Sequence, residues 1–299
     1  MRGRSAASWL SLPLAGLLAA ASPPPAPGPA LGFVSVYNPR LMFLKYQPLV
    51  DYVSVATGTP WNLVIAPSYG SIVQDLCSGK LTAALLGPFA YARAHAACQV
   101  VPVVKLATAG KPEYRGLILV RDDSPFKHLQ DLAGKSVGFG PPMSTGSYLE
   151  ARAMLEDAGL HPGIDVSCRH YAHHDEAARA VLLGQVDACG VREIVGQKYA
   201  RRGLRILARS EEIPNFVLAL APGSDPALRE ELIHALLLKP RKEPAVAETI
   251  QGWDEELSGG FLPASDADYD PVRRLAVRLF GPSALTLPEA SLECRRERR

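Results

Sequence analysis

The chain has 299 residues, with 32 lysines and arginines against 30 aspartates and glutamates, and a formal net charge of +2. This balance gives no reason to expect nucleic acid as a partner, and 47% hydrophobic residues are typical of a folded globular protein. The length allows one large domain or two lobes, each with a sizeable core.

An export signal is predicted at residues 1–21. Arg2 and Arg4 precede an apolar run from Trp9 to Ala21 that ends in the small side chains an export peptidase accepts. The "SPPPAPGPA" behind it cannot continue a helix. The alternative is a retained membrane anchor, but the run is shorter than the roughly 20 residues that a span needs. We therefore expect an exported protein.

From residue 33 the pattern alternates short apolar strands with helical stretches. The strand "GFVSVY" is followed by a helix at 44–57, the strand "WNLVIA", a helix at 69–78 and the strand "LTAALLG". Strands separated by helices of this length predict an α/β fold, with a mostly parallel sheet covered by helices on both faces. Ligands of such sheets bind at the carboxyl ends of the strands.

A second α/β run begins after "YRGLILV" with "SVGFG" and closes near "LRILARS". Two lobes are therefore expected, joined by two crossing strands within 113–124 and 204–220. The start and the end of the chain then belong to the same lobe. The expected limits are 33–115 for the first part of lobe 1, 116–208 for lobe 2, 209–285 for the return to lobe 1 with C-terminal helices, and 286–299 for a solvated basic tail.

The five cysteines raise the question of disulfides, because an exported chain meets an oxidising compartment. Cys77 and Cys98 are 21 residues apart, and so are Cys168 and Cys189, which suggests one pair in each half of the chain. Sequence cannot choose among the connectivities, and Cys294 is left over in the basic tail. The alternative is a thiolate site for a soft metal or metalloid, although no two cysteines have the close spacing of a metal knuckle.

The stretch "GPPMSTGSYLEARAMLEDAGL", residues 140–160, predicts a helix that begins at about Thr145. A helix start offers unpaired backbone amides and the positive end of the helix dipole, and Ser144, Thr145 and Ser147 add hydroxyl groups. The pattern thus fits an anion site. The alternative is that Ser144 only caps an amphipathic helix with a buried face.

The order of the motifs resembles the phosphonate- and phosphite-binding periplasmic proteins of ABC transporters. The resemblance covers nearly all of the chain after the export signal and is carried by "YQPLVDYVSVATG", "APSYGSIVQDLCSGKLTAALLGPFAYARA", "YRGLILVRDDSPFKHLQDLAGKSVGFGPPMSTGSYL", "HDEAARAVLLGQVDACGV", "SEEIPNFVLAL" and "GFLPASDADYDPVRRL". It implies a two-lobed type II binding fold that closes on a small tetrahedral oxyanion.

The resemblance also implies a membrane ABC permease as the partner. No cofactor is expected, and the chain is expected to be a monomer. The alternative is a ligand-sensing module that feeds a membrane histidine kinase, in one variant for arsenite bound through cysteine. Catalysis is not expected, because no activating base is assigned to Ser144.

Several site residues follow from the resemblance. Ser144 and Thr145 match a Ser-Thr-Ser-Gly run that holds the anion, but Gly146 and Ser147 stand in exchanged order here. His174 matches an imidazole that donates to the anion. Further ligand candidates are Tyr69, Tyr91, Tyr37 and Glu193, the last as a partner for an amine; Leu86 stands where some relatives carry a tyrosine.

The segment "CRHYAHHDE" also permits a metal site, since His170, His173, His174 and Asp175 lie close together in the sequence. His170 and His174 share a face only if the segment is helical. A strand is expected to end near Tyr171, which scatters these side chains, so no metal is predicted.

Overall fold

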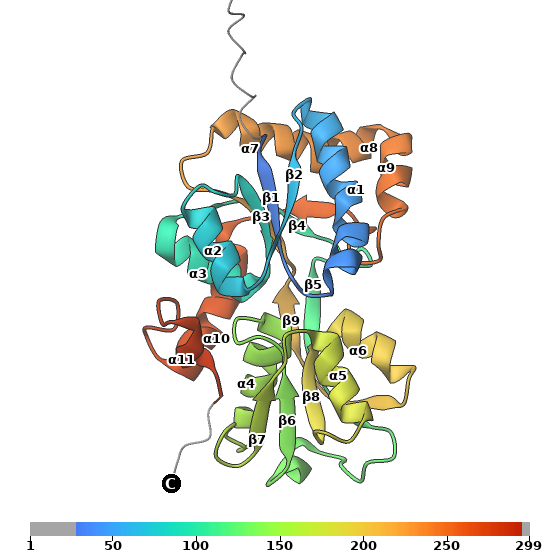
Figure 1. The fold of residues 1–299 in the computed structure, drawn as a ribbon, viewed down its shortest axis with the longest axis vertical. Helices are drawn as coiled ribbons and strands as arrows, with labels where there is room; N and C mark the ends of the chain where they lie inside the picture. The colour runs from blue at the N-terminus through green and yellow to red at the C-terminus, as the bar shows by residue number, and fades with distance from the viewer. Residues whose placement is uncertain (1–27, 295–299) are drawn as a thin grey trace, which may run out of the picture.

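The structure is a computed structural model that describes residues 28–294, and the export signal predicted at residues 1–21 lies outside them. Within 28–294 no helix is both long and apolar enough to cross a membrane. The chain forms two α/β lobes, which lie one above the other along the long axis of the molecule in Figure 1. The predicted two-lobed architecture is confirmed.

Lobe 1 is built on a six-stranded sheet with the strand order β11-β4-β10-β3-β1-β2. Its strands are β1 (Ala30–Val34), β2 (Asn62–Ala66), β3 (Ala83–Leu86), β4 (Val101–Leu106), β10 (Val217–Leu220) and β11 (Phe261–Pro263). Its helices are α1 (Pro39–Thr57), α2 (Tyr69–Cys77), α3 (Pro88–Cys98), α7 (Pro226–Ile233), α8 (Lys239–Lys242) and α9 (Pro244–Gln251), with the π-turn η3 (His234–Leu238) between α7 and α8 and the 3₁₀-turn η4 (Asp266–Tyr269) after β11.

Lobe 2 is built on a five-stranded sheet with the order β7-β6-β8-β5-β9. Its strands are β5 (Glu113–Arg121), β6 (Ser136–Phe139), β7 (Ser167–His170), β8 (Ala188–Arg192) and β9 (Leu204–Pro214). Its helices are α4 (Glu150–Asp157), α5 (His174–Leu182) and α6 (Glu193–Ala200), together with the 3₁₀-turn η1 (Leu129–Leu132) and the π-turn η2 (Thr145–Leu149), which runs directly into α4. Separate apolar clusters cover the two faces of this sheet.

Both sheets are mixed, but most of their strands run in one direction, as the predicted fold class expects: β1, β2, β3 and β4 in lobe 1, and β6, β7, β8 and β9 in lobe 2. Parallel pairs join β1 to β2 and β3 in lobe 1, and β6 to β7 and β8 in lobe 2. The remaining pairs, which involve β4, β5, β9, β10 and β11, are antiparallel. β5 and β10 are the strands that directly follow a crossing from the other lobe. Each starts at the junction, so it runs antiparallel to neighbouring strands whose carboxyl ends point there.

The chain crosses between the lobes at two adjacent places, one between β4 and β5 and the other between β9 and β10. The amide of Asn215 donates to the carbonyl of Pro112 at 2.9 Å, and the amide of Leu106 donates to the carbonyl of Phe216 at 2.8 Å. The two crossing segments are therefore hydrogen-bonded to each other, which is a suitable geometry for a hinge.

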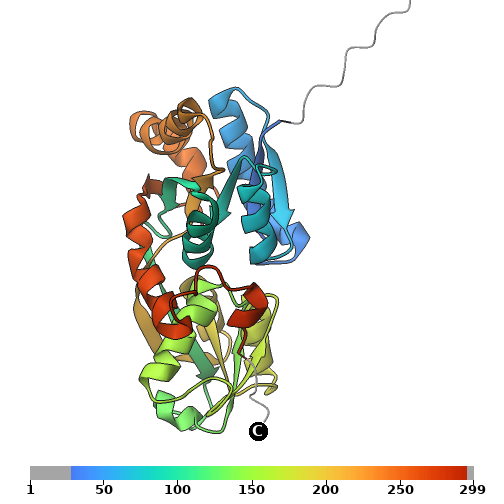
Figure 2. The same cartoon turned by 90° about the vertical axis from the view of Figure 1, so that its left-hand side faces the viewer.

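A third connection is made by the C-terminal strap, residues 281–294, which follows α10 (Asp270–Phe280) and includes α11 (Glu289–Leu292). Arg93 of lobe 1 donates to the carbonyls of Ala284, at 2.9 Å, and Leu287. In lobe 2 the hydroxyl of Tyr148 donates to the carbonyl of Leu292 at 2.5 Å. Figure 2 shows α10 and the strap in red beside both lobes, so this segment is not a free tail.

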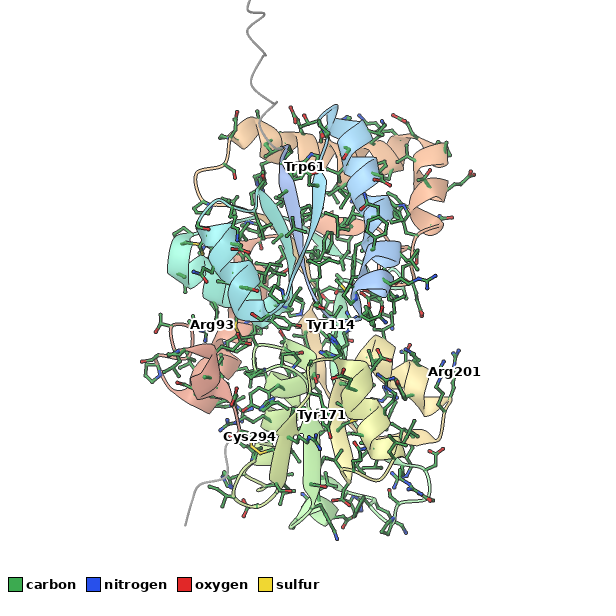
Figure 3. The ribbon with its side chains drawn as sticks, viewed as in Figure 1. Trp61, Arg93, Tyr114, Tyr171, Arg201 and Cys294 are labelled. Atoms are coloured by element: carbon green, nitrogen blue, oxygen red, sulfur yellow. A yellow bond between two sulfur atoms is a disulfide. The ribbon has the colours of Figure 1, made fainter. Side chains whose placement is uncertain are left out.

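Two disulfides are present, and one of them corrects the predicted pairing. Cys77 is bonded to Cys98, as predicted, which ties α2 to α3. Cys168 is bonded to Cys294 of the strap instead of Cys189, and Figure 3 shows this bond in yellow. Cys189 is a free, buried thiol.

The sheet geometry explains why Cys168 and Cys189 do not pair. On β6, which lies between β7 and β8, Val137 is opposite Cys168 and Gly138 is opposite Cys189. A shift of one residue reverses the face to which a side chain points. Cys189 therefore packs in the cluster under α5 and α6, whereas Cys168 packs on the opposite face.

The disulfide of the strap is predicted to stabilise the protein more than the other disulfide does. It closes a separation of 126 residues, against 21 for Cys77–Cys98. Loop-closure entropy assigns about 5 kcal/mol to the longer loop and about 3 kcal/mol to the shorter one. Thermal unfolding of the Cys168→Ser, Cys294→Ser double variant should show a larger loss of Tm than the Cys77→Ser, Cys98→Ser variant. The reverse order would show that the strap is not held in solution.

Candidate functional site

Buried polar side chains are concentrated at the junction of the lobes. Eight buried polar or charged residues occur within 28–294, and six of them, close together in the chain or hydrogen-bonded to one another, form a group that we call the junction cluster. Two of the eight, Ser210 and Asn215, lie on and just after β9. Since burying a polar group is costly unless it has a partner, this concentration makes the junction the candidate functional region. The junction cluster contains Ser144, Thr145, Ser147, His174, Arg192 and Glu256.

The cluster is built around the start of the helix that runs from Thr145 through η2 into α4 and ends at Asp157. The amides at the start of a helix have no acceptor within it, and the helix dipole is positive there. Ser144 is the preceding residue, and its side chain makes no capping bond to the helix. The interpretation of Ser144 as a simple helix cap is therefore not supported, and its hydroxyl is used elsewhere.

Ser147 holds the start of this helix against two strands. Its hydroxyl donates to the carbonyl of Gly190 on β8 at 2.6 Å and accepts from the amide of Gly140, just after β6, at 2.7 Å. A Cβ atom on Gly190 would lie 2.3 Å from the carbonyl oxygen of Ser147, so only glycine permits this approach. Ser147, predicted as a ligand contact, thus has both of these bonds inside lobe 2.

Gly146 faces protein instead of an open space. A Cβ atom at this position would lie 3.0 Å from the ring of Tyr114 and 3.3 Å from Cβ of Arg192. Tyr114 lies between the two lobes in Figure 3. The exchanged order Gly146-Ser147 therefore has a structural reason, because a small residue is needed beside Tyr114 and a hydroxyl is needed between β6 and β8.

Ser144 and His174 form a hydrogen-bonded pair, with 3.0 Å between Oγ and Nε2. Nδ1 of His174 accepts the amide of Arg192 at 3.4 Å, so in a neutral ring the proton lies on Nε2, which donates to Ser144. Burial, together with the nearby charge of Arg192, lowers the pKa of His174 to about 3. His174 is therefore a neutral donor, and it is not oriented to take a proton from Ser144 as the base of a nucleophilic serine would be.

Lobe 1 contributes the facing side of the cluster. The amide of Phe89, at the start of α3, donates to the hydroxyl of Thr145 at 2.9 Å. The hydroxyl of Tyr69, also from lobe 1, approaches Ser144, and that of Tyr114, at the start of β5 in lobe 2, approaches Thr145. The starts of two helices, α3 from lobe 1 and η2 from lobe 2, thus meet here together with neutral hydroxyls, which suits an anion held between the lobes.

Arg192 and Glu256 form a buried ion pair between the lobes that the sequence did not predict. Glu256 also accepts the hydroxyls of Tyr37, at 2.5 Å, and Tyr46, at 2.8 Å. Burial opposes ionisation of Glu256, but Arg192 and these hydroxyls outweigh it and hold its pKa below the usual range. The only feature of the sequence that could have indicated Arg192 is its place directly after "VDACGV", where a strand is expected. Glu256 lies in a loop, and no feature of the sequence indicates it.

The other predicted ligand residues differ in whether they contact the junction cluster. Tyr37 joins it through Glu256 and Arg192. Glu193 lines a cavity of about 100 Å³ that also touches Arg192, and its carboxylate accepts the amide of Arg115 at 3.1 Å. Tyr91 is placed elsewhere: its hydroxyl donates to Asp266 at 2.9 Å and its ring packs on Tyr269. Leu86 is buried on β3.

The alternatives that involve metals are not supported by the arrangement of side chains. No group of three or more histidine, cysteine or acidic side chains suited to a metal ion occurs within 28–294. His170 bonds to the carbonyl of Gly140, and Asp175 pairs with Lys198. A thiolate site for arsenite would have only Cys189, since the four other cysteines are in disulfides, and burial raises the pKa of that thiol.

The fold and this junction define a two-lobed binding protein of the type II periplasmic class. Residues 31–269 match the family described as the periplasmic phosphonate-binding proteins of ABC transporters. The chain belongs to this family. Its members are substrate-binding components of transporters, not enzymes, so a membrane permease is the implied partner and a periplasmic location is implied.

Two curated relatives agree with this assignment. The chain is 27% identical to the phosphate-import protein PhnD of Mycolicibacterium smegmatis over 82% of this chain and 84% of the relative. It is 24% identical to the phosphonates-binding periplasmic protein of Escherichia coli over 82% of this chain and 75% of the relative.

Solved structures show the same fold. PhnD1 of Prochlorococcus marinus, solved in complex with methylphosphonate, has a TM-score of 0.74 at 14% identity, covering 85% of this chain and 98% of the other. A binding protein of an ABC phosphonate transporter from Pseudomonas aeruginosa has a TM-score of 0.71 at 21% identity, covering 86% and 88%.

The neutral state of His174 predicts a pH dependence of stability. Its folded pKa of about 3 lies below its ordinary value of 6.5, so acidification makes the unfolded chain bind a proton that the folded chain does not. The contribution is complete above the ordinary pKa and is lost as the pH falls towards the folded value, with a slope of up to about 1.4 kcal/mol per pH unit.

Urea unfolding from pH ~6.5 to ~4.5 should therefore show a smaller acid slope for His174→Gln than for wild type. The exposed His161→Gln variant is the control for loss of a histidine elsewhere in lobe 2. The groups that titrate in this range are otherwise the same in all three proteins, so their contributions to the acid slope cancel when the slopes are compared. Parallel wild-type and His174→Gln curves would contradict the assignment of a neutral, buried His174.

Proposed function

We propose that this protein captures a small tetrahedral phosphorus oxyanion, a phosphonate, phosphite or phosphate, between its lobes and delivers it to a membrane ABC permease. The observation that carries the proposal is the start of the helix 145–157, where backbone amides, Ser144, Thr145 and the donor His174 converge on the junction. Helix starts and neutral hydroxyls are an established way of binding oxyanions. The names of the relatives, a phosphate importer and a phosphonate-binding protein, support the same ligand class.

A hydrogen bond between the lobes supports a role for closure in the proposed binding. Thr145 already accepts the amide of Phe89 across the junction at 2.9 Å, so the start of α3 closes on the start of η2. An oxyanion between these helix starts would accept hydrogen bonds from both lobes at once, and this differential affinity would favour the closed arrangement. We further propose that the chain is exported through the signal at residues 1–21 and acts as a monomer.

A thermal-shift panel tests the ligand class. Methylphosphonate, aminoethylphosphonate, phosphite, phosphate, sulfate and arsenite are each added to the mature protein. A ligand at a hundred times its Kd should raise the free energy of unfolding by about 2.7 kcal/mol. At least one phosphorus oxyanion is expected to raise Tm more than sulfate and arsenite do. No response to any phosphorus oxyanion would show that the proposed function is wrong, whereas the fold would stand.

Ser144→Ala tests the placement of the site. The substitution removes one hydroxyl from the junction cluster, and loss of a hydrogen bond to a charged ligand should weaken binding roughly 10- to 100-fold. Ser167→Ala, which removes an exposed hydroxyl from β7 of the same lobe, is the matched control and should bind as wild type does. Equal affinities of the two variants for the ligand found in the panel would place the anion away from the start of η2.

A further inference from the structure

Arg192 extends from lobe 2 into lobe 1. It is the last residue of β8, so its side chain leaves the sheet at the same edge as the start of η2. The guanidinium lies between the rings of Tyr37 and Phe216, 5.6 Å from each centroid, and the residue is only 6% exposed. An arginine that is fully desolvated against the opposite lobe is an unusual feature and calls for a strong partner.

The partners of Arg192 use only part of its donor capacity. Nη2 donates to the hydroxyl of Tyr37 at 2.8 Å and to the carboxylate of Glu256. Nε is buried, and within residues 28–294 it has no hydrogen-bond partner. Buried donors without a partner are rare in native proteins, and one on a charged group is the most costly kind.

The base of this side chain lies against the anion-binding elements. The amide of Arg192 bonds to Nδ1 of His174, and its Cα and Cβ lie 3.4 and 3.3 Å from the position that a Cβ on Gly146 would occupy. Arg192 also belongs to the lining of the cavity of about 100 Å³ between the lobes. The side chain that carries a full positive charge and a free donor thus begins beside the start of η2.

The remaining donors of the junction cluster are neutral. Ser144, Thr145 and His174 bring hydroxyls and an uncharged imidazole, so Arg192 is the cation among the buried residues within 28–294. In a site of low dielectric, one full charge distinguishes a doubly charged ligand from a singly charged ligand of the same shape far better than dipoles do. Glu256, held by Tyr37 and Tyr46, fixes the guanidinium in place.

We propose that Arg192 is a direct ligand of the oxyanion, that its buried Nε is the donor used, and that it selects the doubly charged form of a tetrahedral phosphorus oxyanion. Glu256 is the positioning residue of this pair. This inference rests on the proposed function, since it concerns the same site, but it adds a charged contact and a charge preference to a set of neutral donors.

The test compares methylphosphonate with methanesulfonate by isothermal titration at a pH where the phosphonate is a dianion. The two ligands share a tetrahedral shape, and the sulfonate carries one charge less. Arg192→Gln should weaken methylphosphonate binding roughly 10- to 100-fold and methanesulfonate binding much less, which lowers the selectivity ratio. Arg209→Gln, which removes an exposed arginine from β9, is the control for net charge and should leave the ratio unchanged.

The Glu256→Gln variant distinguishes a role of Arg192 in binding the anion from a purely structural role of the Arg192–Glu256 ion pair. Glu256→Gln keeps a side-chain oxygen that can accept from the guanidinium, so Arg192 stays positioned, but it removes the negative charge that competes for it. If Arg192 binds the anion, methylphosphonate should therefore bind at least as tightly as to wild type. If the pair only holds the lobes together, Arg192→Gln and Glu256→Gln should weaken both ligands by similar factors, and that result would overturn the inference.

The double variant Arg192→Gln, Glu256→Gln covers the case in which Arg192→Gln does not fold, because it leaves no unpaired buried charge. It should show the same loss of selectivity, and wild-type selectivity in this variant would overturn the inference. A wild-type protein that binds no phosphorus oxyanion would contradict the proposed function itself. If the wild-type protein binds methylphosphonate and Arg192→Gln leaves the selectivity for methylphosphonate over methanesulfonate unchanged, only the role of Arg192 would be contradicted.

Discussion

The hydroxyl of Ser147 fixes the start of the helix 145–157 against β6 and β8, and the geometry of the site follows from this contact. Because the helix start is pinned at the carboxyl ends of these strands, Ser144 meets His174 and Thr145 faces α3 of the other lobe. Gly140 and Gly190 permit the close approach, since a Cβ on either would collide with Ser147. One side chain thus links the packing of the strands to the position of Ser144 and Thr145 at the junction.

The junction combines neutral donors with one buried ion pair between the lobes. His174 stays uncharged because it is buried beside Arg192, and Glu256 stays charged because Arg192 and two tyrosine hydroxyls stabilise it. Breaking such a pair by removing one partner is far more costly than the pair itself is favourable, so its members act as a unit. Because Arg192 comes from lobe 2 and Glu256 from lobe 1, any separation of the lobes that parts the two residues also breaks this ion pair.

The C-terminal strap adds a constraint that the two hinge strands do not supply. It is hydrogen-bonded to Arg93 of lobe 1 and joined by a disulfide to Cys168 of lobe 2, on the side where α10 and α11 lie in Figure 1. Opening of the lobes must either carry the strap with lobe 2 or break its contacts with lobe 1. The oxidising compartment implied by the family is thus also relevant to the mechanics of the fold.

The amino-acid sequence by itself determined the two-lobed α/β fold and the helix start at Thr145, because strand and helix periodicity and helix-start chemistry are local properties. It suggested Cys77–Cys98 by spacing but could not choose among the connectivities. Only the tertiary structure decided that Cys168 pairs with Cys294, since a one-residue shift across β6 sends Cys189 to the other face. It also brought Glu256 to Arg192 and placed Tyr91 beside Asp266. These contacts join residues far apart in the chain, and their partners depend on how the lobes pack, which no local pattern encodes.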